Sequence, residues 1–216
     1  MELTASVYGG DAMNKKFFSL PQEKQQSILN AGYRVFSASS YKKSPVREIA
    51  EAAGISKSLL FHYFQNKREL YLFLWETCTR ITLDQLQKSG CYETEDLFEA
   101  MRRGLLAKAE IMRCYPHMGA FAVRAYYERD SEVCDALQRS IAHHASFQTN
   151  ARRLRLDPSR FAPGLDLRLM YQNMYLATEG YLWEKVQKGN VDCDEMERDF
   201  MKMIDFWKSI YLRKEK

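Results

Sequence analysis

The 216-residue sequence has few of the residues that interrupt secondary structure, with five prolines and ten glycines. These are too few for a sandwich or barrel with many turns, and no stretch shows the alternation of apolar and polar residues that predicts a strand. Apolar residues instead recur every three to four positions, and 46% of the chain is hydrophobic, enough to bury a sizeable core. The sequence therefore predicts an all-α protein.

Long hydrophobic runs are also missing. The longest uninterrupted run is Leu70–Trp75, whereas a helix that spans a bilayer needs about 20 apolar residues. Residues 1–20 contain charges of both signs and no central apolar stretch, so they do not resemble a secretory signal. We expect a cytoplasmic protein that makes no membrane contact.

The five cysteines are widely spaced and include no C-x-x-C pair; they are Cys78, Cys91, Cys114, Cys134 and Cys193. An odd, scattered set argues against a disulfide framework and against structural zinc, so we expect reduced thiols. Cys114 and His117 have C-x-x-H spacing, but Pro116 breaks the helical register between them. Neighbouring histidines on a helix, such as His143 and His144, point apart. The sequence predicts no metal site and no cofactor.

Neither sign of charge dominates the chain as a whole, which has a formal net charge of +4. Residues 1–70 hold ten basic and six acidic side chains, whereas residues 71–216 hold 22 of each. The entire excess lies in the first third. This distribution is typical of a nucleic-acid-binding module attached to a neutral domain, although a solvated basic face would produce the same pattern.

Short helices are predicted within this basic segment. Residues 22–38 show helical spacing of apolar side chains and predict a first helix. A second helix is expected from Ser44 as N-cap and Pro45 as first helical residue. Gly54 ends it, because glycine readily takes the left-handed conformation.

A further short helix follows directly, with Ser56 as its N-cap, and reaches about residue 62. Two short helices joined by the Ala53–Ile55 turn form a helix-turn-helix, whose second helix lies in the major groove of DNA. Asn66 then caps a long helix, and Glu69, three residues later, can return a bond to the N–H of the cap.

The stretch from Val46 to Leu70 closely resembles the signature of the TetR family of bacterial regulators. Its core, G-I-S-K-S-L-L-F-H-Y-F at residues 54–64, is followed by N-K-R-E-L at residues 66–70. The resemblance covers about residues 22–70, while the rest of the chain matches only in length and helical character. It implies a three-helix DNA-binding domain over residues 1–69, with its recognition helix at about 56–62. It also implies an effector-binding and dimerisation domain over residues 70–216.

The resemblance also implies which residues contact DNA. Phosphate contacts are expected for Ser44, Lys57, Tyr63 and Lys67, and the recognition face comprises Lys57, Ser58, Leu59, Phe61 and His62. Hydroxyl and ammonium donors beside a helix N-terminus suit a phosphate. Core positions are predicted for Ile49, Ile55, Leu60 and Phe64.

Two residues depart from the family pattern. Position 59 is usually small or polar and position 61 usually Tyr, but here they are Leu59 and Phe61. Both could contact thymine methyl groups in the major groove. Leu59 could instead pack in the core beneath Ile55, and His62 could either donate to a phosphate or stack on the surface of the domain.

Beyond residue 70, five or six further helices are predicted, with breaks near Gly90 and near residues 115–116, 129–130, 157–164 and 189–190. Large apolar residues in this region are numerous enough to line an effector cavity, although each could equally be ordinary core. The candidates are Met112, Met118, Phe121, Tyr126, Tyr127, Phe147, Tyr175 and Trp183.

The last two predicted helices carry wide apolar stripes, which have more than one surface to cover. In the resembling family this pair forms a four-helix interface with its copy, and a groove-reading module uses two-fold symmetry to contact two half-sites. The interface residues expected here are Met170, Met174, Tyr181, Phe200, Met203 and Trp207.

These patterns predict a homodimeric, sequence-specific transcriptional regulator. We expect a repressor that a small, mostly apolar effector releases from double-stranded operator DNA. The alternatives are an activator of the same fold or an architectural DNA-binding protein. An enzyme fits poorly, because the sequence has no Gly-rich phosphate loop, no G-x-S-x-G and no H-E-x-x-H.

Overall fold

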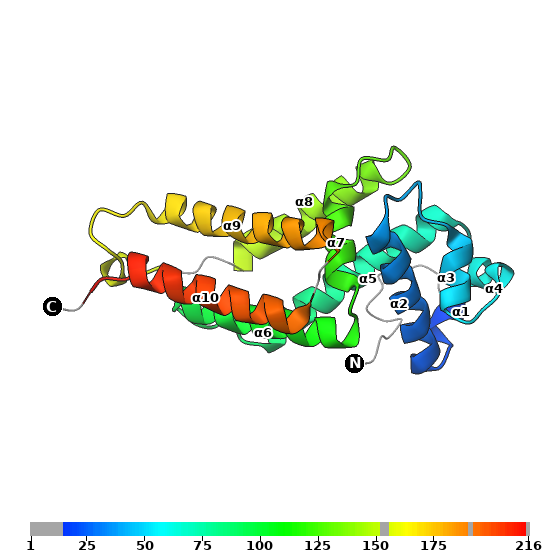
Figure 1. Cartoon of the computed structure of the whole chain (residues 1–216), viewed down its shortest axis with the longest axis horizontal. Helices are drawn as coiled ribbons and strands as arrows, with labels where there is room; N and C mark the ends of the chain where they lie inside the picture. Colours follow the sequence, from blue (N-terminus) through cyan, green and yellow to red (C-terminus); the bar gives the residue numbers. More distant parts are fainter. Residues whose placement is uncertain (1–14, 152–155, 190–191, 215–216) are drawn as a thin grey trace. The chain divides into compact units, whose positions relative to one another are not determined.

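The computed structural model describes residues 15–151, 156–189 and 192–214, with side chains of helix α8 described as far as residue 144. Within these ranges all regular elements are helical (Figure 1), which confirms the predicted all-α class. They are α1 (Lys15–Phe18), α2 (Gln22–Ala38), α3 (Val46–Ala52), α4 (Lys57–Tyr63), α5 (Lys67–Lys88), α6 (Leu97–Cys114), α7 (Met118–Tyr127), α8 (Cys134–Ala151), the 3₁₀ turn η3 (Pro158–Arg160), α9 (Leu167–Gln187) and α10 (Cys193–Tyr211). None of the described helices is long and apolar enough to cross a membrane.

Packing divides the chain into two compact units. The first comprises the described residues within 1–79 and 115–141, and the second those within 80–114 and 142–216. Helices α5 and α8 each begin in the first unit and end in the second. The predicted boundary after residue 69 separates a DNA-binding domain from an effector-binding domain by function and not by packing, and it stays a prediction.

The core of the first unit is aromatic. Helix α2 packs against α3 and α7, and Phe36, Tyr71 and Phe121 are almost completely buried. The ring centroids of Phe36 and Tyr71 are 4.8 Å apart, and those of Tyr71 and Phe121 are 5.2 Å apart. Edge-to-face pairs of this kind contribute roughly 0.5–1.5 kcal/mol each beyond the area that they bury. This cluster joins α2, α5 and α7.

Helix α1 is not among the predicted elements. Phe17 is completely buried, with its ring centroid 5.4 Å from that of Phe64 and 5.1 Å from that of Phe73. The side-chain amide of Gln25 donates to the carbonyl of Leu20 at 2.8 Å, which closes the turn after α1. Because α1 is a single turn, periodicity cannot reveal it.

In the second unit, α10 packs against α6, and an apolar cluster joins both helices to α9. Phe98, Met174 and Ile204 are each 2% exposed or less within it. An antiparallel bridge pairs Phe161 with Leu212. This bridge holds the segment before α9 against the residues that follow α10.

Residues predicted for the dimer interface pack inside the single chain. Met170 and Met174 are each 2% exposed and Trp207 is 6% exposed. The other three, Tyr181, Phe200 and Met203, are partly buried. The prediction is therefore corrected for Met170, Met174 and Trp207, which are core residues. The physical reason is that α9 and α10 use their methionine-rich stripes to build the core of one chain.

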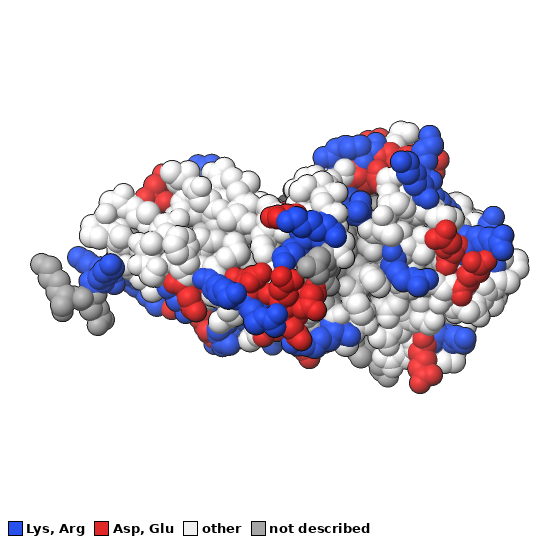
Figure 2. All heavy atoms as spheres, viewed as in Figure 1, with Lys and Arg blue, Asp and Glu red and all other residues white. Residues whose placement is uncertain are grey.

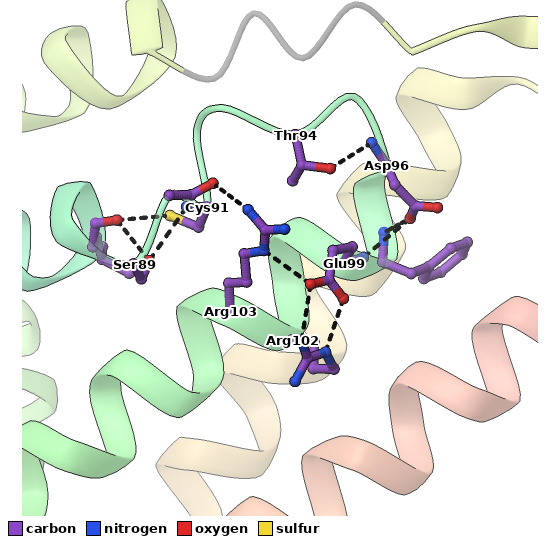
Figure 3. A network of polar contacts seen from close by, with 10 residues as sticks. Ser89, Cys91, Thr94, Asp96, Glu99, Arg102 and Arg103 are labelled. Carbon is purple, nitrogen blue, oxygen red and sulfur yellow. Dashed lines mark hydrogen bonds and ion pairs between the residues drawn. The ribbon is translucent and has the colours of Figure 1, made fainter.

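A polar network stabilises the corner between α5 and α6 (Figure 3). The Asp96 carboxylate accepts a hydrogen bond from the N–H of Glu99 at 3.0 Å in the first turn of α6. The Glu99 carboxylate accepts hydrogen bonds from Arg102 and Arg103 at 2.8 Å each, and Arg103 also donates to the carbonyl of Gly90. The bonds from these guanidinium groups lower the pKa of Glu99 to about 2. The network therefore ties α6 to the loop before it.

Candidate nucleic-acid interface

A sharp turn joins α3 to α4. Gly54 has φ +67°, a left-handed conformation that side-chain-bearing residues rarely adopt, although a Cβ there would meet nothing within 4 Å. The N–H of Ile55 donates to the carbonyl of Ala50 at 3.0 Å, and the N–H of Gly54 donates to that of Glu51 at 3.1 Å. These bonds satisfy the last carbonyls of α3. The predicted role of Gly54 is therefore confirmed.

Helix α4 begins at a capped N-terminus. The side chain of Ser56 accepts a hydrogen bond from the N–H of Leu59 at 3.1 Å, as predicted for an N-cap. The Ser58 hydroxyl lies 2.9 Å from that of Ser56. Loss of such a cap costs about 0.5–2 kcal/mol. The start of α4 is thereby fixed relative to the turn.

One face of α4 is buried and the other is exposed. Leu60 and Phe64 are completely buried, as is Ile49 of α3, which confirms these predicted core positions; Ile55 is partly buried. The outer face carries the exposed Lys57, Ser58, Leu59 and His62, with Phe61 and Tyr63 partly exposed beside them. Leu59 is 37% exposed. It therefore lies on the outer face and not in the core.

The outer face of α4 combines cationic and aromatic groups. The Lys57 ammonium lies 5.7 Å from the ring centroid of Phe61. The rings of His62 and Tyr63 are arranged edge to face, with centroids 5.9 Å apart. This surface offers hydrogen-bond donors for phosphates and apolar groups for base edges.

Lys67 lies at the edge of a surface hollow of about 340 Å³, lined by Tyr41, Lys42, Asn66, Lys67, Arg68 and Glu132. Its ammonium group donates to the carbonyl of Lys42 at 3.2 Å and lies 4.7 Å from the ring centroid of Tyr41. Partial burial lowers the pKa of Lys67, and the negative charges of Glu132 and Asp130 oppose this effect. In a partly desolvated site a phosphate interacts with the ammonium more strongly than at an open surface.

The N-terminus of α5 adds to this site. The Asn66 side chain accepts a hydrogen bond from the N–H of Glu69 at 2.9 Å. In return the Glu69 carboxylate accepts a hydrogen bond from the N–H of Gln65 at 2.7 Å. The sequence predicted this bond from the N–H of Asn66, one residue later. The positive end of the helix dipole lies next to Lys67 and favours an anion there.

Ser44 faces inward, unlike the other predicted contacts. It is 1% exposed, and its hydroxyl donates to the carbonyl of Ser40 at 3.0 Å. Helix α3 begins at Val46, with Pro45 at the N-cap position and no side-chain cap, so the predicted cap is displaced by one residue. Because the hydroxyl is enclosed, we leave Ser44 out of the proposed DNA surface.

The eight residues predicted to line an effector cavity are divided between the two compact units. Met118 and Phe121 are buried, Met112 is partly buried, Tyr126, Tyr127, Tyr175 and Trp183 are exposed, and Phe147 lies outside the described side chains. The Phe121 ring packs 5.3 Å from that of Tyr33 and 5.2 Å from that of Tyr71, as a core residue does. A cavity lined by these residues stays a prediction.

Sequence reasoning missed Tyr41 and Glu132, which line the hollow together with Lys67, and Glu128, which contacts Tyr41. The N–H of Tyr41 donates to the Glu128 carboxylate and its hydroxyl donates to that of Glu132, both at 2.7 Å. Burial, followed by the hydrogen bond to Glu132, raises the pKa of Tyr41. The only local signal is an aromatic residue in the polar stretch between residues 39 and 44. Its partners lie 87 and 91 residues further along the chain.

Comparison with known proteins supports this description. The family model for bacterial regulatory proteins of the tetR family matches residues 28–73, from within α2 to the first turns of α5. The chain is 33% identical over 64 residues to the HTH-type transcriptional regulator AcrR of Shigella flexneri, and the match covers 30% of each chain. It is 22% identical over 166 residues to the HTH-type transcriptional repressor AcnR of Corynebacterium efficiens, which covers 75% of this chain and 81% of AcnR.

A solved structure extends the similarity beyond the N-terminal helices. The fold resembles that of LfrR from Mycobacterium smegmatis, solved in complex with proflavine, with a TM-score of 0.56 and 14% identity. That match covers 85% of this chain and 96% of LfrR. The tetR family model therefore matches the helix-turn-helix segment in sequence, and the LfrR structure matches most of the chain in fold.

Proposed function

We propose that this protein is a sequence-specific DNA-binding transcriptional regulator that contacts its operator with helix α4. The outer face of α4 carries the proposal, because Ser58, Leu59 and His62 are exposed on a helix that Ser56 caps. Buried Leu60 holds the opposite face in the domain. A rigid helix with an exposed, mixed polar and apolar face is what major-groove recognition requires.

We assign different roles to different parts of this surface. Lys57, Tyr63 and Lys67 are the proposed phosphate contacts, which set affinity and register. Ser58, Leu59, Phe61 and His62 are proposed to lie in the groove, where hydrogen bonds and contacts with thymine methyl groups select the sequence. His62 can also reach a phosphate from the same face.

We propose that the protein acts as a homodimer through the outer faces of α9 and α10. On α9, Leu169, Leu176 and Trp183 recur every seven residues and are 55%, 57% and 39% exposed, and on α10 Phe206 and Ile210 are 60% and 46% exposed. Figure 2 shows that few charged side chains lie over α9 and the C-terminal half of α10. Exposed apolar residues gathered on adjacent helices are typical of an interface.

We propose that a small, mostly apolar effector binds within residues 70–216 and weakens operator binding, so that the protein acts as a repressor. Support comes from the abundance of aromatic and methionine side chains in this region. It also comes from LfrR, of similar fold, which was solved with proflavine, and from AcnR, which is named a repressor. Helix α5, which begins with Lys67 and continues to residue 88, links the two regions covalently.

Binding-site selection from random duplexes tests the DNA-binding proposal. The wild-type protein should enrich a two-fold symmetric sequence with half-sites about 34–36 Å apart. Ser58→Ala should change the preferred bases, whereas Lys24→Ala, an exposed change on α2, should leave them unaltered. A reporter that carries the selected site should lose expression for a repressor and gain it for an activator. If no sequence is enriched, the proposal fails.

A ligand screen tests the effector proposal. Compounds that raise the melting temperature should bind about 5- to 150-fold more weakly when operator is present, because the coupling between two sites is reciprocal. Stabilising compounds whose affinity is indifferent to operator would contradict it.

A further inference from the structure

The loop between α7 and α8, residues 128–133, contacts two segments of the helix-turn-helix module. Glu132 accepts a hydrogen bond from the Tyr41 hydroxyl through its side chain. Through its backbone carbonyl it accepts another from the guanidinium of Arg68 at 2.6 Å. Tyr41 lies in the connection between α2 and α3, and Arg68 lies in the first turn of α5. One loop residue thus touches both segments that border Lys67.

Tyr41 connects Glu132 to Lys67. Its ring is 3% exposed and lies edge to face with that of Tyr71, with centroids 5.1 Å apart. The Lys67 ammonium rests on the same ring, at 4.7 Å from the centroid. A cation over an aromatic face gains roughly 0.5–2 kcal/mol, depending on its exposure. The position of the ring therefore influences where the ammonium group lies.

Glu128 gives the loop its shape and adds a second attachment to Tyr41. One of its carboxylate oxygens accepts hydrogen bonds from the N–H groups of Arg129 and Asp130, at 2.9 and 3.0 Å. The other oxygen accepts from the N–H of Tyr41 at 2.7 Å. Both the backbone and the hydroxyl of Tyr41 are therefore held by carboxylates of this loop.

We propose that Glu132 is a positioning residue for DNA binding: through Tyr41 it holds Lys67 where a phosphate of the operator is bound. The inference rests on the proposed function, which supplies the role of Lys67. The loop is continuous with α7 and α8, so the proposed phosphate site is connected to both helices as well as to α5.

The sign of the effect distinguishes positioning from simple charge. Glu132 places a negative charge beside the proposed path of a polyanion, so electrostatics alone predicts that its removal strengthens DNA binding. Positioning through Tyr41 predicts the reverse. At about 0.15 M salt charges more than about 8 Å apart are largely screened, so the charge of Glu132 acts only on groups close to it, and by charge alone its removal there should strengthen binding.

The test measures operator affinity at that salt concentration, using the duplex obtained by binding-site selection. Glu132→Ala removes both the charge and the hydrogen-bond acceptor, and should weaken binding roughly 3- to 10-fold, as expected for one net hydrogen bond. Glu132→Gln keeps an acceptor for the Tyr41 hydroxyl and should bind as tightly as wild type or more tightly. Asp135→Asn, an exposed carboxylate in the first turn of α8, removes a matched charge and should not weaken binding.

Two further measurements identify the route. In a Lys67→Ala background, Glu132→Ala should have no additional effect on affinity, because the group that it positions is gone. Tyr41→Phe removes only the hydroxyl and should weaken operator binding, as Glu132→Ala does. It replaces Glu132→Ala as the test if thermal unfolding shows that the Glu132→Ala variant is not folded.

Some results would overturn the inference. The first is a Glu132→Ala variant that binds operator as tightly as the wild-type protein or the Asp135→Asn variant does. The second is a Glu132→Gln variant that loses as much affinity as Glu132→Ala. The third is a loss of affinity on Glu132→Ala that is equally large in the Lys67→Ala background. The proposed function fails separately, if the wild-type protein selects no operator at all.

Discussion

Two adjacent leucines of α4 should respond in opposite ways to truncation. Leu60 is completely buried, whereas Leu59 is 37% exposed. Leu60→Ala removes buried methyl groups and leaves a cavity, so it should lower the free energy of unfolding by about 2–5 kcal/mol. Leu59→Ala leaves no enclosed cavity and should cost below about 1 kcal/mol. If Leu59 contacts a thymine methyl group, its loss should relax base preference by about 1–3 kcal/mol at one symmetric pair of positions.

The assay combines urea unfolding with binding-site selection on each folded variant. The expected result is a nearly normal unfolding midpoint and an altered consensus for Leu59→Ala. For Leu60→Ala we expect a lowered midpoint and, in the fraction that remains folded, an unaltered consensus. The reasoning would be refuted if Leu59→Ala lowered the midpoint as much as Leu60→Ala did and left the selected sequence unchanged.

Three further predictions follow from the same structure. If a dimer neutralises ~6–10 phosphates, the logarithm of operator affinity should fall with the logarithm of salt concentration at a slope of about −5 to −9. Lys67→Ala should flatten that slope by about 1–2 without changing base preference. A changed base preference with an unchanged slope would place Lys67 at a base edge. Because the pKa of Glu99 is lowered from 4.5 to about 2, its ion pairs stabilise the fold above about pH 4.5 and this stability is lost as the pH falls towards 2. Glu99→Gln should therefore lower the melting temperature at pH 7, with a difference from wild type that disappears towards pH 2; a constant difference would contradict the assignment. Leu176→Glu should convert the dimer to a monomer in sedimentation experiments. Leu106→Glu should leave the dimer intact, because this leucine lies on α6, where it is 37% exposed. If both variants stay dimeric, α9 is not part of the interface.

The helix-turn-helix was predictable because short-range interactions determine it. The Ser56 cap, the left-handed Gly54 and the buried Leu60 each depend on residues within a few positions in the chain. Helix breaks behaved in the same way: α5 ends at Lys88, just before the positive φ of Gly90. Local propensity and the tertiary fold agree from Gly54 to the end of α4.

The features that the sequence did not predict depend on contacts between distant segments. The contact between Tyr41 and Glu132 spans 91 residues, and neither residue belongs to a recognisable motif. Helix α9 is apolar on two faces, so its pattern could not show whether Met174 or Leu176 faces the core. The structure shows that Met174 is 2% exposed and Leu176 57% exposed. Ser44 suited a cap or a phosphate contact equally well, but the loop around it turns its hydroxyl inward.

The most direct test of the account is the affinity of the wild-type protein for its selected operator relative to a scrambled duplex of the same length and composition. Both must be measured at one physiological salt concentration, because the phosphate contribution depends strongly on salt. If α4 contacts base edges as proposed, the operator should bind about 10³-fold or more tightly than the scrambled duplex. Equal affinity for the two duplexes would show that the protein binds only the phosphate backbone, and would contradict its assignment as a sequence-specific regulator.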